Sequence, residues 1–200
     1  MTFIPEARIE NRAAEVWRRH ALEPNFDLEV LLDRLQLGLL WDRLPINVLG
    51  ALHAQEHLVI LNQDRLREFQ AMPGLERFTI GHEIGHAILH AEDSWTEVLP
   101  LMESGKTWCR DGSSDPTEFQ ANRFASYLLV PTDRLLRVLP TSPWSGWSPI
   151  YRLAETFGIT PTAMIVRLEQ GQLAHRDDAS KPASGPRARD LAGQETLPGI

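Results

Sequence analysis

The sequence has almost no cysteine, no long apolar run and no excess of positive charge, and each of these absences excludes a class of protein. The single cysteine, Cys109, excludes an internal disulfide framework and is typical of a protein from a reducing compartment. No apolar run approaches the roughly 18 residues that a transmembrane helix needs. The N-terminal residues also lack the apolar core of a secretory signal peptide. We therefore expect a cytoplasmic protein that does not span a membrane.

The charge balance limits the function further. The formal net charge is −7, which argues against a protein that works mainly by wrapping the phosphates of a nucleic acid. The same charge is compatible with binding a basic protein partner, such as a DNA-binding protein. With 200 residues, of which 42% are hydrophobic and 24% are charged, the chain suffices for one globular domain with a real core.

Apolar residues at helical spacing dominate the chain, and only two short stretches favour strands. The β-branched stretches 46–49 and 58–61 predict a hairpin. We therefore expect an α+β fold over residues 1–172, mostly helical with a small antiparallel sheet, followed by a disordered polar tail over residues 173–200. The helices are predicted at 6–20, after the N-cap residue Asp27, from about Arg65 to His90, and at 118–129, 132–139, 150–157 and 161–170.

The last two predicted helices flank Gly158 and superficially suggest a helix-turn-helix unit that reads DNA. The pair is only weakly basic, however, and its apolar residues recur at the spacing of a buried face. We expect the pair to pack on the core and the protein not to bind nucleic acid directly. The apolar positions are Leu153, Phe157, Ile165 and Leu168.

The most specific pattern is His82-Glu83-Ile84-Gly85-His86. Residues four apart on an α-helix are separated by about 40° around its axis, so both imidazoles leave the same face one turn apart. That spacing lets both rings reach one metal ion. Glu83 lies about 100° around the helix from His82, where it can take a proton from a water molecule at the metal and deliver it to a leaving amine. This H-E-x-x-H pattern is typical of zinc peptidases.

A catalytic zinc site needs a third protein ligand. His90 is four residues beyond His86, but three successive helical turns do not converge on one ion, because the outer side chains start about 12 Å apart along the axis. We expect His90 to be a structural group or a neighbour of the ligands. The remaining candidates are Glu92, Glu97, Glu103, Cys109 and Glu118.

Glu118 is the best placed of these candidates, because it begins a second helix on which Asn122 lies one turn later. Glu118 could complete the metal site, and Asn122 could hydrogen-bond a ligand imidazole and orient it. An alternative stays open at this point. Asp115, Pro116 and Glu118 also have the layout of a helix start, with an N-cap, a proline and a capping-box glutamate.

Two separated motifs resemble the ImmA/IrrE-type metallopeptidases. The first runs from Arg77 to His90 through the H-E-x-x-H pattern, and the second runs from Glu118 to Pro131. The stretches Trp108–Arg110 and Leu153–Thr160 are similar to parts of the same family, and the resemblance covers roughly residues 5–172. It implies a zincin-like fold with the H-E-x-x-H helix in its core. It also implies that Glu118 is the third metal ligand.

The resemblance further implies a zinc-dependent endopeptidase, with manganese as the alternative metal. Its substrate is expected to be a helix-turn-helix transcriptional repressor, so that the enzyme acts as an antirepressor in a stress response. The rival interpretation is a non-catalytic regulator that a metal stabilises and that works by binding a repressor or another protein. The intact Glu83 favours the enzyme, because a purely structural metal site needs no general base.

Two further hypotheses concern the surroundings of the site. Leu58–Leu61 could be an edge strand on which an extended substrate aligns by strand addition, although a plain core strand is an equal alternative. Cys109, in the long irregular segment 91–117, could reach the metal as a thiolate. A lone cysteine is more commonly a buried apolar group, and we expect that role for it.

Overall fold

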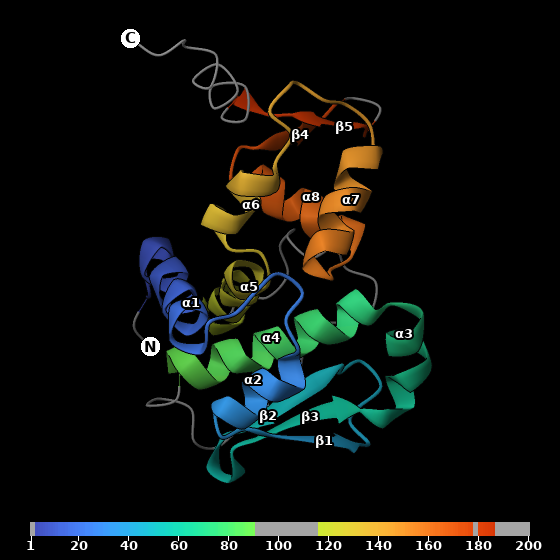
Figure 1. Cartoon of the computed structure of the whole chain (residues 1–200). Coiled ribbons are helices and arrows are strands. Elements are labelled where there is room, and N and C mark those ends of the chain that lie inside the picture. Colours follow the sequence, from blue (N-terminus) through green and yellow to red (C-terminus); the bar gives the residue numbers. More distant parts are fainter. Residues whose placement is uncertain (1–2, 91–115, 178–179, 187–200) are drawn as a thin grey trace.

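The computed structural model describes residues 3–90, 116–177 and 180–186. Two long helices, α4 and α5, cross in the middle of the molecule, with a three-stranded sheet on one side and a group of shorter C-terminal helices on the other (Figure 1). The predicted mostly helical α+β fold is confirmed. The helices are α1 (Glu6–His20), α2 (Leu28–Arg34), α3 (Leu66–Ala71), α4 (Pro73–His90), α5 (Pro116–Leu129), α6 (Thr132–Val138), α7 (Ser148–Phe157) and α8 (Pro161–Gln170); the strands are β1 (Gly38–Asp42), β2 (Gly50–His53), β3 (Leu58–Asn62), β4 (Ala174–Arg176) and β5 (Pro182–Ser184).

The three-stranded sheet is mixed rather than antiparallel. β3 is its central strand, parallel to β1 and antiparallel to β2. β1 was not predicted from the sequence, and the first strand of the predicted hairpin lies at 50–53 instead of 46–49. Because β3 is paired on both sides, the hypothesis that Leu58–Leu61 is an edge strand is wrong.

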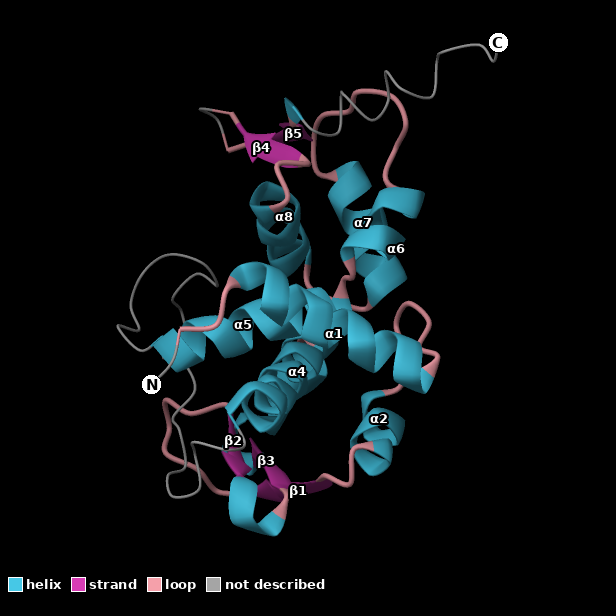
Figure 2. Ribbon diagram, turned by 90° about the vertical axis from the view of Figure 1, so that its left-hand side faces the viewer, coloured by secondary structure: helices cyan, strands magenta, loops and turns pink. Residues whose placement is uncertain are grey.

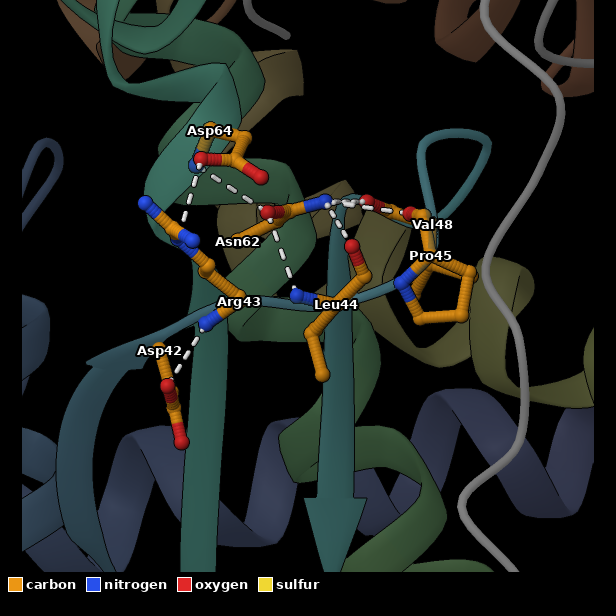
Figure 3. Close-up of polar contacts among 7 residues, drawn as sticks. All are labelled: Asp42, Arg43, Leu44, Pro45, Val48, Asn62 and Asp64. Atoms are coloured by element: carbon orange, nitrogen blue, oxygen red, sulfur yellow. Dashed lines mark hydrogen bonds and ion pairs between the residues drawn. The ribbon is translucent and has the colours of Figure 1, made fainter.

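The displaced strand is explained by one buried side chain, Asn62 at the end of β3 (Figure 3). Its amide nitrogen donates to the carbonyl oxygens of Leu44, Pro45 and Val48 at 3.3, 3.1 and 2.7 Å. Its side-chain oxygen accepts from the backbone N–H groups of Leu44 and Asp64 at 3.3 and 3.1 Å. These bonds replace the partners that the backbone would find in a strand, so the chain between β1 and β2 folds into a loop.

Among the described residues, β2 has the free edge on the side of the sheet opposite β1. Leu49 and Asn62 face each other at the end of the β2–β3 ladder. The N–H of Asn62 donates to the carbonyl oxygen of Leu49 at 2.8 Å, so these two residues form a hydrogen-bonded pair. In an antiparallel pair such residues alternate with residues whose N–H and C=O groups point away. Gly50 and Leu52 therefore direct their backbone groups to the free edge. β2 packs against α4, the helix that α5 crosses (Figure 2).

The C-terminal helices pack on the core, as their apolar spacing predicts. The buried residues of α7 and α8 include Leu153, Phe157, Ile165 and Leu168. The buried Arg167 of α8 ties this part to the end of α5, because its Nε donates to the carbonyl oxygen of Val130 at 3.0 Å. None of the helices among the described residues has the length and apolar character that would let it cross a membrane.

Part of the predicted disordered tail forms structure. Ala174–Arg176 and Pro182–Ser184 pair as antiparallel strands beyond α8, so the prediction of a tail without structure from residue 173 is wrong for these residues. Leu173 and Ala174 are buried. These two apolar residues pack on the protein although the segment that follows them is mostly polar. Residues 187–200 and 91–115, which include Cys109, lie outside the described residues. The last two residues of the irregular segment predicted over 91–117 begin α5 instead.

Candidate metal site

Three buried side chains from α4 and α5 converge at the crossing of the two helices. Nε2 of His82 lies 2.9 Å from Nε2 of His86. One carboxylate oxygen of Glu118 lies 3.3 Å from the His82 nitrogen, and the other lies 3.2 Å from the His86 nitrogen. Among the described residues, these three side chains form a group with the spacing of metal ligands. The α4 spacing brings the imidazoles together, and the crossing of α5 adds the carboxylate.

The geometry of this group fits a zinc ion. Ligand atoms at roughly 2.0–2.1 Å from a tetrahedral ion are separated from one another by about 3.3 Å, and the three measured separations are close to that value. Two bare imidazole lone pairs at this distance in a buried place would repel, so either a proton or a metal ion lies between the two nitrogens. A site of two imidazoles and one carboxylate leaves a fourth position open.

His82 is oriented by a residue of the second helix. Asn122 Oδ1 lies 2.8 Å from His82 Nδ1. Because a carboxamide oxygen only accepts, the hydrogen bond assigns the proton to Nδ1 and leaves the Nε2 lone pair facing His86 and Glu118. Burial lowers the pKa of His82 from its usual value, although the nearby carboxylate of Glu118 acts in the opposite direction. The ring is therefore neutral, the form that binds a metal.

Glu118 is held as a carboxylate. Burial alone would raise its pKa, but the neighbouring imidazoles of His82 and His86 lower it to about 2. The carboxylate faces the imidazoles through both of its oxygens. The partner that the capping-box alternative requires, Asp115, lies outside the described residues. The side chain therefore has the charge, the direction and the distance of a metal ligand.

Glu83 is a buried carboxyl group beside the three converging side chains. Its side chain is 1% exposed, and neither carboxylate oxygen has a hydrogen-bond partner among the described residues. Burial raises the pKa of Glu83 well above its usual value, and the negative charge of Glu118 adds to the rise. An acidic group with a raised pKa in a buried site can exchange a proton near neutral pH.

Comparison with known proteins bears on the same two helices. A family model, the IrrE N-terminal-like domain (Peptidase M78), matches residues 70–169, which is half of the chain and contains α4 and α5. This chain belongs to the IrrE N-terminal-like family. The family confirms the resemblance that the two motifs carry. Membership supports a metallopeptidase-type or regulatory role for the chain.

A search of solved structures gives a "Mycobacterium tuberculosis transcriptional regulator", with a TM-score of 0.49 and 16% sequence identity. The similarity covers 82% of this chain and 46% of that one, so the chain spans less than half the length of that regulator. Curated protein sequences give no match.

The other candidates of this IrrE-type domain lie outside the ligand group. His90 is buried at the end of α4, and its ring centroid is 5.6 Å from that of His86. It is a neighbour of a proposed ligand and not a member of the convergent group, as the helical spacing predicts. Tyr127 is not part of the group either, because its hydroxyl is turned to α1, where it donates to Glu6 at 2.8 Å. Glu92, Glu97, Glu103 and Cys109 lie outside the described residues.

One part of the surroundings was missed by the sequence analysis. The free edge of β2 depends on which strand occupies the centre of the sheet, and the short pattern over Gly50–His53 contains no strong strand signal beyond its apolar residues.

Proposed function

We propose that this chain is a zinc-dependent endopeptidase that hydrolyses a peptide bond in a protein substrate. The observation that carries the proposal is the buried convergence of His82, His86 and Glu118 beside a buried carboxyl group, Glu83, that lacks a partner among the described residues. Membership of the IrrE N-terminal-like family supports it. A metal site that only stabilised the fold would need the three ligands but not this fourth acidic group.

His82, His86 and Glu118 would hold the ion. Two imidazoles and a carboxylate suit zinc better than magnesium or calcium, and manganese is the alternative. A bound zinc ion supplies Lewis acidity, which lowers the pKa of water and polarises the scissile carbonyl group. Asn122 keeps the His82 ring turned toward the ion, and His90 packs beside His86.

Glu83 is the proposed catalytic residue. As a general base it accepts a proton from the attacking water molecule. It then donates that proton to the nitrogen of the departing amine, so the carboxyl group ends in the state in which it began. The burial that raises the pKa of Glu83 supports this role, because a carboxyl group of ordinary acidity would hold the proton less well between the two steps.

The proposed substrate is a helix-turn-helix transcriptional repressor, so that cleavage would release the genes it silences in the cytoplasm. The net charge of −7 favours a basic partner of this kind over nucleic acid itself. The free edge of β2 supports an extended substrate, because the backbone groups of Gly50 and Leu52 on that edge pair with no strand among the described residues.

The test is incubation of the zinc-loaded protein with candidate repressors, beginning with one encoded beside this gene, and detection of fragments by mass spectrometry. Glu83→Gln is the catalytic variant. Glu76→Gln, two turns earlier on the same helix, is the matched control. We expect cleavage by the wild type and the control, and a loss of about 10²-fold or more in Glu83→Gln. Equal cleavage by Glu83→Gln would refute the mechanism, and tight binding without cleavage would favour the non-catalytic regulator.

A further inference from the structure

α4 and α5 pack tightly at Gly85, which lies between the proposed catalytic residue and the second histidine. A β-carbon placed on Gly85 would lie 3.0 Å from the carbonyl oxygen of Ala121, 3.1 Å from its Cα and 3.3 Å from Cβ of Phe124. Two of these three atoms belong to the α5 backbone, which cannot turn aside as the end of a flexible side chain can. A side chain at Gly85 would therefore push α5 away.

Gly81, one turn earlier, provides a direct comparison on the same face. A β-carbon there would lie 3.5 Å from Cβ of Ala125, 3.6 Å from Cδ1 of Leu129 and 3.7 Å from Cα of Ala125. These are ordinary van der Waals separations. An alanine fits at Gly81 without displacement of α5, so of these two glycines only Gly85 lacks the space for a side chain.

The α5 segment that contacts Gly85 is the turn that carries the metal-facing side chains. Ala121 lies three residues after Glu118 and directly before Asn122. The far end of α5 is held elsewhere, because the carbonyl oxygen of Leu128 accepts a hydrogen bond of 2.6 Å from Trp17 Nε1. A displacement at Ala121 therefore tilts the first turns of α5 instead of moving the whole helix.

We propose that Gly85 is a positioning residue of the metal site, and that its missing side chain sets the approach of α5 at which Glu118 and Asn122 both reach the histidines. Metal–ligand distances tolerate only about ±0.2 Å, and relief of a 3.0 Å backbone contact requires a shift of similar size or more. Rotation of the Glu118 side chain cannot compensate fully, because the shorter Asn122 moves with the same turn. This inference rests on the proposed metal site.

The experiment compares Gly85→Ala with Gly81→Ala in the full chain. Zinc affinity is measured by competition with a chromophoric chelator, and the stability of the metal-free protein by urea unfolding. We expect Gly81→Ala to bind zinc within about twofold of the wild type and to be at least as resistant to urea, since alanine favours helices. Gly85→Ala should bind zinc about 10- to 100-fold more weakly, the range found when groups that orient ligands are lost.

The outcomes separate this inference from the metal site itself. A wild type that does not bind zinc overturns the metal site and the inference together. If the wild type binds zinc and Gly85→Ala binds it equally well, the inference is overturned and the metal site stands. This holds whatever the urea result, because a glycine with a merely structural role would change only the stability of the protein. If Gly85→Ala does not fold, it is replaced by Ala121→Ser, which adds an atom at the same crossing from α5. Unchanged zinc affinity in that folded variant counts against the inference.

Discussion

The side-chain oxygen of Asn122 lies 2.8 Å from Nδ1 of His82, so the second helix holds the ring that the first helix supplies. The contact joins residues 40 positions apart in the chain. It keeps the proton on Nδ1 and directs Nε2 toward His86 and Glu118. The orientation of the histidine therefore depends on the packing of α5 as well as on the spacing within α4.

Removal of the Asn122 oxygen should weaken zinc binding. We expect Asn122→Ala to lower the zinc affinity about 10- to 100-fold, because the His82 ring loses the acceptor that fixes its orientation. Asn122→Asp is the control, since a carboxylate of the same length also accepts from Nδ1. Chelator competition measures both variants. Wild-type affinity in Asn122→Ala would contradict the orienting role.

Glu83→Gln should stabilise the metal-free protein at neutral pH. The pKa of Glu83 is raised well above its usual value by burial, so its contribution to stability is complete below the unfolded pKa of about 4.3 and is lost as pH rises through the folded pKa. The glutamine does not ionise and escapes this loss. We therefore expect Glu83→Gln to unfold at a higher urea concentration than the wild type at pH 7.

Urea unfolding of both proteins in the presence of a chelator measures this difference. The advantage of Glu83→Gln should shrink as pH falls toward about 4.3, where the wild-type carboxyl is protonated in both the folded and the unfolded state. A difference that does not vary with pH would show that the ionisation of Glu83 is not its cause.

Tyr127 should ionise only in strong alkali. Burial and the hydrogen bond to Glu6 together raise the pKa of Tyr127 to about 12. The chain has two tyrosines, so Tyr151→Phe leaves Tyr127 as the only phenol, and absorbance at about 295 nm then follows it alone. Because the folded pKa exceeds the unfolded value of about 10, the stabilisation is complete below pH 10 and is lost between about 10 and 12. Glu6→Gln should lower the midpoint. A midpoint near 10 in a protein that is still folded would be inconsistent with the Tyr127–Glu6 contact.

Proline at two adjacent positions of β2 should have different effects. The N–H of Leu52 points to the free edge of β2, whereas the N–H of Ala51 points toward β3 and belongs to the hydrogen-bonded ladder. Leu52→Pro should keep the fold and zinc affinity but lower repressor cleavage by about tenfold, which corresponds to a loss of about 1.4 kcal/mol of binding. Ala51→Pro should destabilise the sheet itself, because proline cannot donate to the ladder. Circular dichroism measures the fold of each variant, chelator competition its zinc affinity, and fragment analysis its cleavage of the repressor. Equal losses of cleavage and zinc binding in Leu52→Pro would exclude a role of the β2 edge in aligning the substrate.

Local features were predicted best, because neighbouring residues determine them. The expected N-cap, Asp27, accepts hydrogen bonds from the backbone N–H groups of Glu29 and Val30 in the first turn of α2. The helices of the C-terminal pair begin and end close to the predicted positions, since proline and glycine limit the backbone locally. The strand expected at 46–49 failed because Asn62, more than a dozen residues away, takes over the backbone partners of that segment.

The sequence by itself determined that His82 and His86 leave one face of a helix with Glu83 beside them, because the α-helix has a fixed number of residues per turn. It also determined which side chains could serve as the third ligand. Only the tertiary structure decided that Glu118 reaches the two imidazoles, that Asn122 orients one of them, and that β2 presents the free edge of the sheet. These relations depend on how closely α4 and α5 approach and on the order of the strands. Both are set by packing among residues far apart in the chain, and Gly85 against Ala121 is the contact that limits the approach.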